Sequence, residues 1–119
     1  MRSAPRLNFE IHFQKNTADL TSASCLGLDA LGTILQKEHL SAQFTLGGHT
    51  DMDGTPSVNG PLSQARAESA RDYLVENYGI DPERLEARGY GMSEPLHPLE
   101  RSLREKQVNR RVDLRLRRF

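Results

Sequence analysis

The last segment of the chain alternates strictly between apolar and charged side chains. Val112, Leu114 and Leu116 share one side of this alternation. The opposite side carries charged residues throughout, namely Arg111, Asp113, Arg115 and Arg117. A period of two is typical of a β-strand with one face against a core, and residues 7–14 repeat it with apolar side chains at the odd positions. The two ends of the chain are therefore predicted to be strands that share a sheet.

Helical periods lie between these strands. Thr21 or Ser22 can cap a helix that runs to about Lys37, and its core-facing stripe is Leu28, Leu31 and Leu35. A second predicted helix has Pro61 in its first turn and Gly79 at the position after its end.

Two shorter apolar runs complete the pattern, at residues 42–48 and 85–88. The predicted fold class is α+β, a β-α-β-α-β-β two-layer sandwich. Two main helices cover one face of a four-stranded mixed sheet, and the polar half of each strand faces solvent on the other.

Composition excludes several function classes. At 119 residues the chain is one domain, and 16 basic residues balance 16 acidic ones. With no net charge, the chain has no overall electrostatic attraction for nucleic acid or an anionic membrane. No apolar run approaches the roughly 20 residues that span a bilayer. Residues 1–6 lack the apolar region of a signal peptide, so the chain is either cytoplasmic or a domain of a longer exported protein. Cys25 is alone, which excludes an internal disulfide.

One turn concentrates the chemistry of the chain. Gly48-His49-Thr50-Asp51-Met52-Asp53-Gly54 places two carboxylates after a strand, and Arg66 follows in what the pattern predicts as the first turn of a helix. A fixed anion beside a fixed cation suits a small zwitterion. Asn59 either caps that helix or donates to the same ligand. The bland alternatives are ordinary turn chemistry for the carboxylates and a solvated surface arginine.

Other chemistries fit poorly. A calcium loop counted from Asp51 would need Gly and Glu where Pro56 and Leu62 stand. The four histidines have no metal-ligand spacing, and His49 beside Asp51 has no accompanying nucleophile motif. Arg110 and Arg111 are predicted to point to opposite faces, and the arginine row lacks the interleaved aromatic residues of an RNA surface.

Taken together, these motifs resemble the OmpA-like C-terminal domain, which includes peptidoglycan-associated lipoproteins and the peptidoglycan-binding part of flagellar stator proteins. The resemblance covers residues 7–118 in order. It is carried by the following residues: Phe13, Ala18 and Leu20; Gly48-His49-Thr50-Asp51 and Gly54; Asn59, Leu62-Ser63 and Arg66-Ala67; Gly79-Ile80; Gly89-Tyr90-Gly91 and Pro95; and Asn109-Arg110-Arg111-Val112.

The resemblance implies a non-catalytic domain, without a cofactor, that holds the diaminopimelate of the peptidoglycan stem peptide. Asp51 would accept the ligand ammonium and Arg66 its carboxylate. The implied polar ring is completed by Asn16, Asn59 and Arg110, with backbone N–H groups near Asp53 and Gly54. Alanine at Asp51 or Arg66 is expected to remove binding with little change in melting temperature.

The same resemblance implies a place in the periplasm. Residues 1–6 would be a disordered lead and residues 7–119 the binding domain, tethered to the outer membrane or cell envelope through a segment before Met1. Other envelope proteins are expected partners. Two rivals stay open: a protein-interaction module of the same fold with a vestigial pocket, and a hydrolase that acts on the cell wall.

Overall fold

The fold is described from a computed structural model, over residues 6–37 and 42–118. The elements along the chain are β1 (Arg6–His12), α1 (Ser22–Lys37), β2 (Gln43–Gly48), α2 (Pro56–Tyr78), the short 3₁₀ turn η1 (Pro82–Arg84), β3 (Leu85–Gly89), α3 (Leu103–Asn109) and β4 (Arg111–Arg118). Strand β1 begins at Arg6, one residue inside the predicted lead, and residues 1–5 lie outside the described residues.

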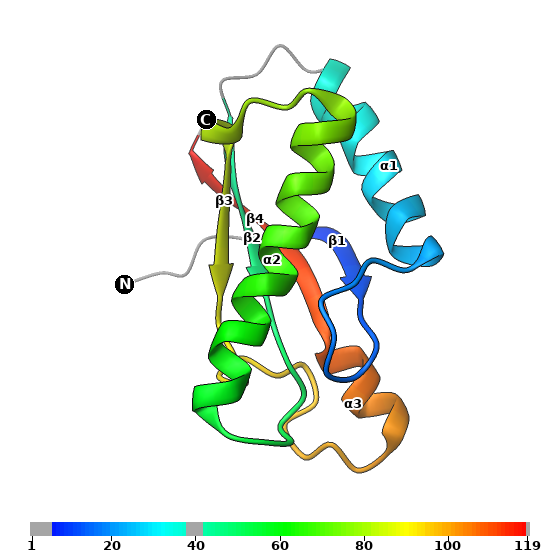
Figure 1. Ribbon diagram of the computed structural model, residues 1–119, viewed down its shortest axis with the longest axis vertical. Helices are drawn as coiled ribbons and strands as arrows, with labels where there is room; N and C mark the ends of the chain where they lie inside the picture. The colour runs from blue at the N-terminus through cyan, green and yellow to red at the C-terminus, as the bar shows by residue number, and fades with distance from the viewer. Residues whose placement is uncertain (1–5, 38–41, 119) are drawn as a thin grey trace.

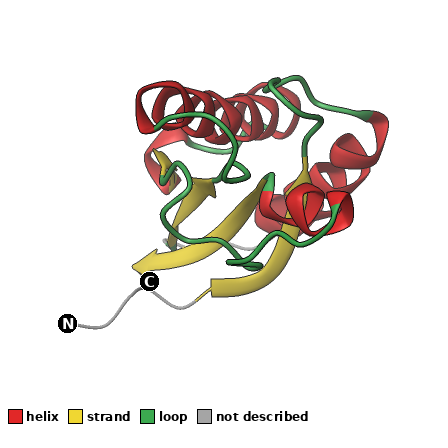
Figure 2. Ribbon diagram, turned by 90° about the horizontal axis from the view of Figure 1, so that it is seen from below, coloured by secondary structure: helices red, strands yellow, loops and turns green. Residues whose placement is uncertain are grey.

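The four strands form one mixed sheet in the order β1-β4-β2-β3. Strand β4 runs antiparallel to both neighbours, whereas β2 and β3 are parallel. A parallel pair requires a crossover connection, which α2 supplies. Helices α1 and α2 lie on one side of the sheet (Figures 1 and 2). The predicted α+β class and two-layer arrangement are confirmed.

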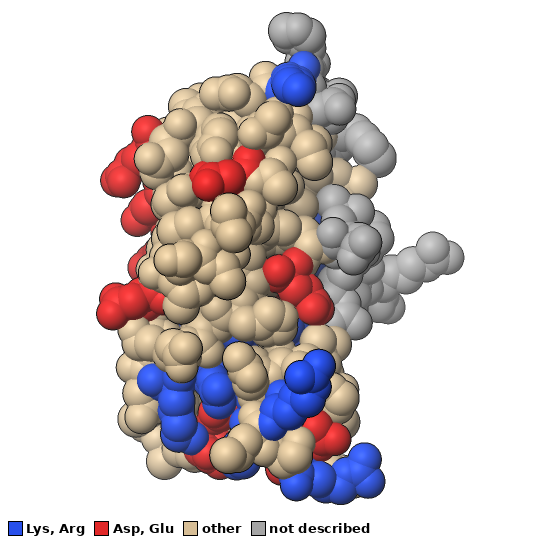
Figure 3. Space-filling view, turned by 90° about the vertical axis from the view of Figure 1, so that its right-hand side faces the viewer, with Lys and Arg blue, Asp and Glu red and all other residues tan. Residues whose placement is uncertain are grey.

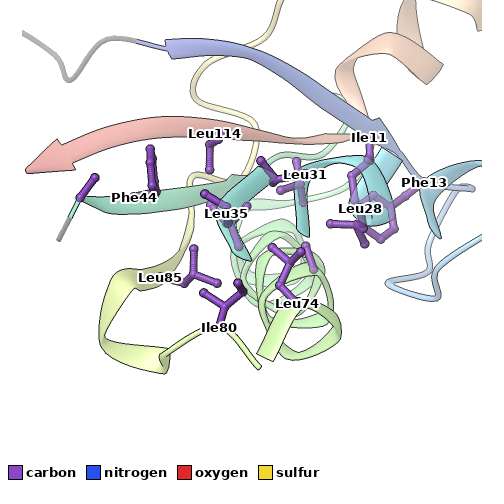
Figure 4. Close-up of a cluster of buried hydrophobic side chains, with 14 residues drawn as sticks. Ile11, Phe13, Leu28, Leu31, Leu35, Phe44, Leu74, Ile80, Leu85 and Leu114 are labelled. Carbon is purple, nitrogen blue, oxygen red and sulfur yellow. The ribbon is translucent and has the colours of Figure 1, made fainter. Parts of the chain in front are cut away.

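The hydrophobic core fills the space between this sheet and the two long helices (Figure 4). The predicted stripe of α1 is buried in it, with Leu28 fully enclosed. Val112 and Leu114 of β4 face it from the sheet. At the start of α1, the Thr21 hydroxyl accepts the Ser24 N–H at 3.1 Å, so Thr21 rather than Ser22 caps this helix.

The prediction that Pro61 lies in the first turn of α2 is wrong. The helix begins at Pro56, with Thr55 as its N-cap residue, and Pro61 lies inside it. A proline there removes one backbone hydrogen bond, to the carbonyl of Ser57. Both residues are exposed, so water can satisfy that carbonyl. The end was predicted correctly: Gly79 takes the left-handed conformation (φ 63°) and its N–H bonds the Val75 carbonyl.

The second face of the sheet also departs from the prediction. Arg111, Asp113 and Arg115 were expected to face solvent, yet they are 0%, 1% and 6% exposed. The segment after β3 covers them: Arg111 donates to the Glu94 carbonyl, and Arg115 donates to the Glu94 carboxylate at 2.6 Å. Charge alone does not keep a side chain in water when pairing and hydrogen bonds compensate for its burial.

Candidate functional site

A close approach of α2 to β2 brings the site together. A Cβ atom at Gly48 would lie 1.9 Å from the Ser63 carbonyl oxygen, so only glycine allows the helix backbone this near the strand. The chain leaves β2 directly into the turn that carries Asp51 and Asp53. The turn is therefore fixed against the flank of α2.

Asp51 is a buried carboxylate in the turn after β2, with 5% of its surface exposed. Arg110 Nη1 donates to its Oδ2 at 3.0 Å, and the Asp53 N–H donates to its Oδ1 at 3.1 Å. Lys15 Nζ lies 3.6 Å from the same Oδ2. Asp51 is thus a fixed anion, as predicted, but it already has cationic partners in the protein.

Arg66 lies deeper than the sequence indicated. It is the eleventh residue of α2 rather than a residue of its first turn, so the positive end of the helix dipole does not act beside it. It is fully buried, and it donates to the carbonyls of Gln14, Thr17 and His49 at 2.9–3.0 Å. The predicted alternative of a solvated surface arginine is therefore wrong.

The guanidinium of Arg66 keeps part of its binding capacity. Three of its five N–H groups are used by these carbonyls, which leaves two for another acceptor. Burial and the nearby Arg110 lower the pKa of Arg66 to about 10, while Asp51 acts in the opposite direction. Arg66 stays cationic at neutral pH, within electrostatic reach of both Asp51 and Arg110.

The turn between β1 and α1 lies over this charge pair. Asn16 is exposed and takes a positive φ of 61°, a conformation that asparagine tolerates better than most residues. Gln14 and Thr17, which flank Lys15 and Asn16, bear carbonyls that accept from Arg66. The Lys15 ammonium from this turn pairs with Asp53 as well as Asp51. We call residues 14–17 the covering turn.

Asp53 plays a different part from Asp51. It is exposed, and it pairs with Lys106 at 2.6 Å and with Lys15. Hydrogen bonds from Lys106 and Lys15 lower the pKa of its carboxyl to about 2. Gly54, next in the chain, has a φ of 93°, which lets the turn reverse toward α2.

Asn59 supports this turn from inside α2. It is buried, and its amide donates to the Asp53 carbonyl at 2.9 Å and to the Met92 sulfur at 3.1 Å. It does not cap the helix, because the helix begins three residues before it. Its contacts make Asn59 a residue that positions the Asp51 turn.

Two partners of the turn escaped the sequence analysis. The Glu100 carboxylate accepts the Met52 N–H at 2.9 and 3.0 Å and the Asn109 amide at 2.6 Å. Lys106 pairs with Asp53 and lies 3.6 Å from Glu100. Glu100 stands in a proline-rich segment without periodicity, so no local pattern marks it. Asn109 belongs to the Asn-Arg-Arg-Val motif and could have been selected on that basis.

Arg110 and Arg111 point in different directions, as predicted. Arg110 donates to Asp51 and to the Phe13 carbonyl, whereas Arg111 contacts Asp113 and Glu94 across the sheet. On that far side, His49 Nε2 lies 3.0 Å from Asp113. The imidazole is therefore not paired with Asp51.

The ring of His49 stacks on Tyr90, and Arg115 lies 4.3 Å from the centre of that same tyrosine ring. Burial lowers the pKa of His49, although its hydrogen bond to Asp113 acts in the opposite direction. Burial tends to raise the pKa of Asp113, but hydrogen bonds from His49 and Arg115 outweigh it and lower it to about 2. These contacts make a structural network behind the Asp51 turn.

The face that carries the covering turn has a distinctive charge pattern. Basic side chains gather at its lower end, with acidic side chains between them (Figure 3). Within residues 6–37 and 42–118, no group of His, Cys, Asp and Glu is arranged to hold a metal ion. No helix in that part of the chain is long and apolar enough to cross a membrane. The mixture of basic and acidic side chains on this face is suited to binding a ligand that carries both charges.

Known proteins are similar to this chain in sequence and in fold. The model of the OmpA family matches residues 12–110. Outer membrane porin F of Pseudomonas aeruginosa is 32% identical over 91% of this chain, but the match spans only 30% of the porin's length. Outer membrane protein P5 of Haemophilus influenzae is 33% identical over 76% of this chain and 25% of its own length.

Solved structures of other proteins have the same fold as this chain. The peptidoglycan-associated lipoprotein of Burkholderia pseudomallei superimposes with a TM-score of 0.83 at 25% identity, over 92% of this chain and 91% of that one. A structure described as the cell wall anchor of the T6SS from Pseudomonas aeruginosa gives 0.75 at 27% identity, over 92% and 80% of the two chains.

Proposed function

The chain belongs to the OmpA family, and from that premise we propose that it binds peptidoglycan without cleaving it. In this role it anchors a parent envelope protein to the cell wall from the periplasm. The names of two relatives support the proposal, since one is a peptidoglycan-associated lipoprotein and the other a cell wall anchor. The two curated relatives described above are outer membrane proteins, and this chain spans less than a third of the length of each.

The proposed ligand is the side-chain end of meso-diaminopimelate in the stem peptide. This group carries one ammonium and one carboxylate, and the site offers the complementary pair. Asp51 accepts the ammonium, and Arg66 binds the carboxylate through the N–H groups that its carbonyl partners leave free. The observation that carries the proposal is the buried Asp51 carboxylate, held 3.0 Å from Arg110 and within electrostatic reach of Arg66.

The remaining proposed residues complete this polar ring. Arg110 stands beside Asp51, and Asn16 lies on the covering turn. Asn59 and Asp53 shape the loop that presents Asp51, and Gly54 lets its backbone approach the ligand. The ligand reaches Arg66 when the covering turn moves aside.

Binding at a single site is expected to be weak. Hydrogen bonds to charged groups contribute about 1.5–3 kcal/mol each, and two or three of them must offset the cost of association. The expected Kd lies between about 1 μM and 1 mM. Weak sites suit an anchor on a polymer, because many tethered copies act together.

A titration tests this proposal directly. The tripeptide L-Ala-γ-D-Glu-meso-diaminopimelate should bind the intact domain, and the matched peptide with L-lysine in the third position should bind about tenfold or more weakly. Lysine keeps the ammonium but lacks the side-chain carboxylate, so it leaves the arginine half of the site without a partner. No detectable binding of the first peptide at millimolar concentration would falsify the proposal.

The closed state of the site favours one rival. Asp51 and Arg66 both have partners within the protein, as a vestigial pocket in a protein-interaction module would. Purified sacculi separate the two functions: a peptidoglycan-binding domain pellets with them without any other protein, and an interaction module stays in the supernatant. Release of soluble muropeptides would indicate the hydrolase instead.

A further inference from the structure

Lys15 places a primary ammonium between the two carboxylates of the site. Its Nζ pairs with Asp53 Oδ2 and lies 3.6 Å from Asp51 Oδ2. The proposed ligand offers the same chemical group to the same carboxylate. In the structure, the site therefore already contains an ammonium group, and this group belongs to the protein itself.

We propose that Lys15 is an internal competitor, whose ammonium holds the place of the ligand's ammonium until the ligand displaces it. This inference rests on the proposed function, because it assumes that the ligand's ammonium binds Asp51. It adds a residue and a step: opening of the site requires the Lys15 side chain to leave.

The contacts identify Lys15 as the partner that moves. Its side chain is 47% exposed, and its nitrogen is farther from Asp51 than that of Arg110. The Arg110 side chain is only 13% exposed, and it is held by two hydrogen bonds of 3.0 Å, to Asp51 and to the Phe13 carbonyl. An exposed lysine exchanges carboxylate partners for water at low cost.

The covering turn links this displacement to the arginine half of the site. Lys15 stands between Gln14 and Thr17, whose carbonyls accept two of the three hydrogen bonds from Arg66. The same short turn thus presents an ammonium to Asp51 and carbonyl oxygens to Arg66. It satisfies both ends of the charge pair that the zwitterion would satisfy.

The charge balance agrees with displacement. Three carboxylates meet in and around the Asp51 turn, from Asp51, Asp53 and Glu100. The cations paired with them are Lys15, Lys106 and Arg110. When Lys15 leaves, an incoming ammonium restores the balance at Asp51, and Lys106 continues to neutralise Asp53.

The test compares Lys15→Met with wild type in a titration with the diaminopimelate tripeptide. Methionine keeps most of the side-chain length and removes the charge. We expect about two- to fivefold tighter binding, the range that loss of one exposed ion pair allows. Lys15→Arg keeps the competing charge and should bind within about twofold of wild type. Lys37→Met makes the same charge change at the opposite end of α1 and should leave the affinity unchanged.

The outcomes separate this inference from the proposed function. If wild type binds and Lys15→Met binds equally or more weakly, the competitor role is wrong while the proposed function stands. If neither protein binds, the proposed function fails and this inference fails with it.

A second measurement needs no variant. In wild type, the side-chain ammonium resonance of Lys15 should shift toward that of the exposed Lys37 as tripeptide is added. An unchanged resonance at saturation would overturn the displacement.

Discussion

Arg110 Nη1 donates to Asp51 Oδ2 at 3.0 Å, joining the residue before β4 to the turn after β2. The two residues stand 59 positions apart, and the strands next to them, β2 and β4, are antiparallel neighbours. This pair sets the anionic half of the candidate site. It also ties the site to the C-terminal strand, so site geometry and sheet assembly depend on each other.

Asp51→Asn should lower the affinity for the diaminopimelate tripeptide by about tenfold or more, because the amide has no negative charge to pair with an ammonium. It also leaves Arg110 without its anion, so the unfolding free energy should fall by about 1–3 kcal/mol. Calorimetric titration and denaturant unfolding measure the two effects.

Asp53→Asn is the matched control, since Asp53 is exposed and Asp51 is buried. It should change the affinity by no more than a few-fold. Equal losses of affinity in the two variants would contradict the distinct roles assigned to these carboxylates.

Arg66→Ala should destabilise the domain as well as remove binding. The sequence alone suggested an unchanged melting temperature, but three backbone carbonyls, of which that of His49 is buried, lose their donor in this variant. We expect a loss of about 3 kcal/mol or more, equivalent to a melting temperature lower by about 10 °C.

Arg71→Ala on the same helix is the control. Arg71 makes one hydrogen bond to a backbone carbonyl, and its side chain is 32% exposed. Its melting temperature should fall by no more than a few degrees. A stable Arg66→Ala protein would show that these carbonyls find other donors.

Gly48→Ala should prevent normal folding, because the added Cβ would lie 1.9 Å from the Ser63 carbonyl oxygen and neither backbone can yield alone. We expect a loss of at least about 3 kcal/mol, seen as loss of the cooperative thermal transition or a large fall in melting temperature.

Gly60→Ala provides the opposite case, since nothing lies within 4 Å of a Cβ there and the residue is helical. Alanine should raise the unfolding free energy by up to about 1 kcal/mol. A destabilised Gly60→Ala protein would contradict this account of α2.

Stability should fall as the pH drops from 7 toward 5. Burial lowers the pKa of His49 in the folded state below its value of about 6.5 in the unfolded chain. The unfolded state therefore binds the proton first, and stability is lost from about pH 6.5 downward until the pH passes the folded pKa.

His49→Gln keeps a hydrogen-bond donor for Asp113 but does not titrate, so this slope should be absent from its unfolding free energy. Below about pH 4 both proteins should lose further stability, because the folded pKa of Asp113 is about 2 and lies below its unfolded value. An identical pH dependence of the two proteins above pH 5 would exclude His49 as the cause.

Local patterns in the sequence predicted most of the fold. The period of two in β4 and the helical stripe of α1 reflect which side chains face the core, and the core contains Val112, Leu114 and Leu28 as expected. The start of α2 was missed because Pro61 was taken as a first-turn residue. Proline favours that position but tolerates a helix interior where water reaches the freed carbonyl.

The motif spacing selected Asp51, Arg66 and Arg110, and the structure brings these three together at one end of the sheet. The sequence by itself determined the four strands, the two long helices and which charges gather in one region, because periodicity and turn chemistry are local. Only the tertiary structure decided what each charge contacts. Arg111 and Arg115 of β4 are buried under the segment after β3. Arg66 donates to carbonyls up to 52 positions away, and Lys15 pairs with the Asp53 carboxylate. Burial and pairing depend on segments distant in the chain, and the charge of a side chain does not specify its partner.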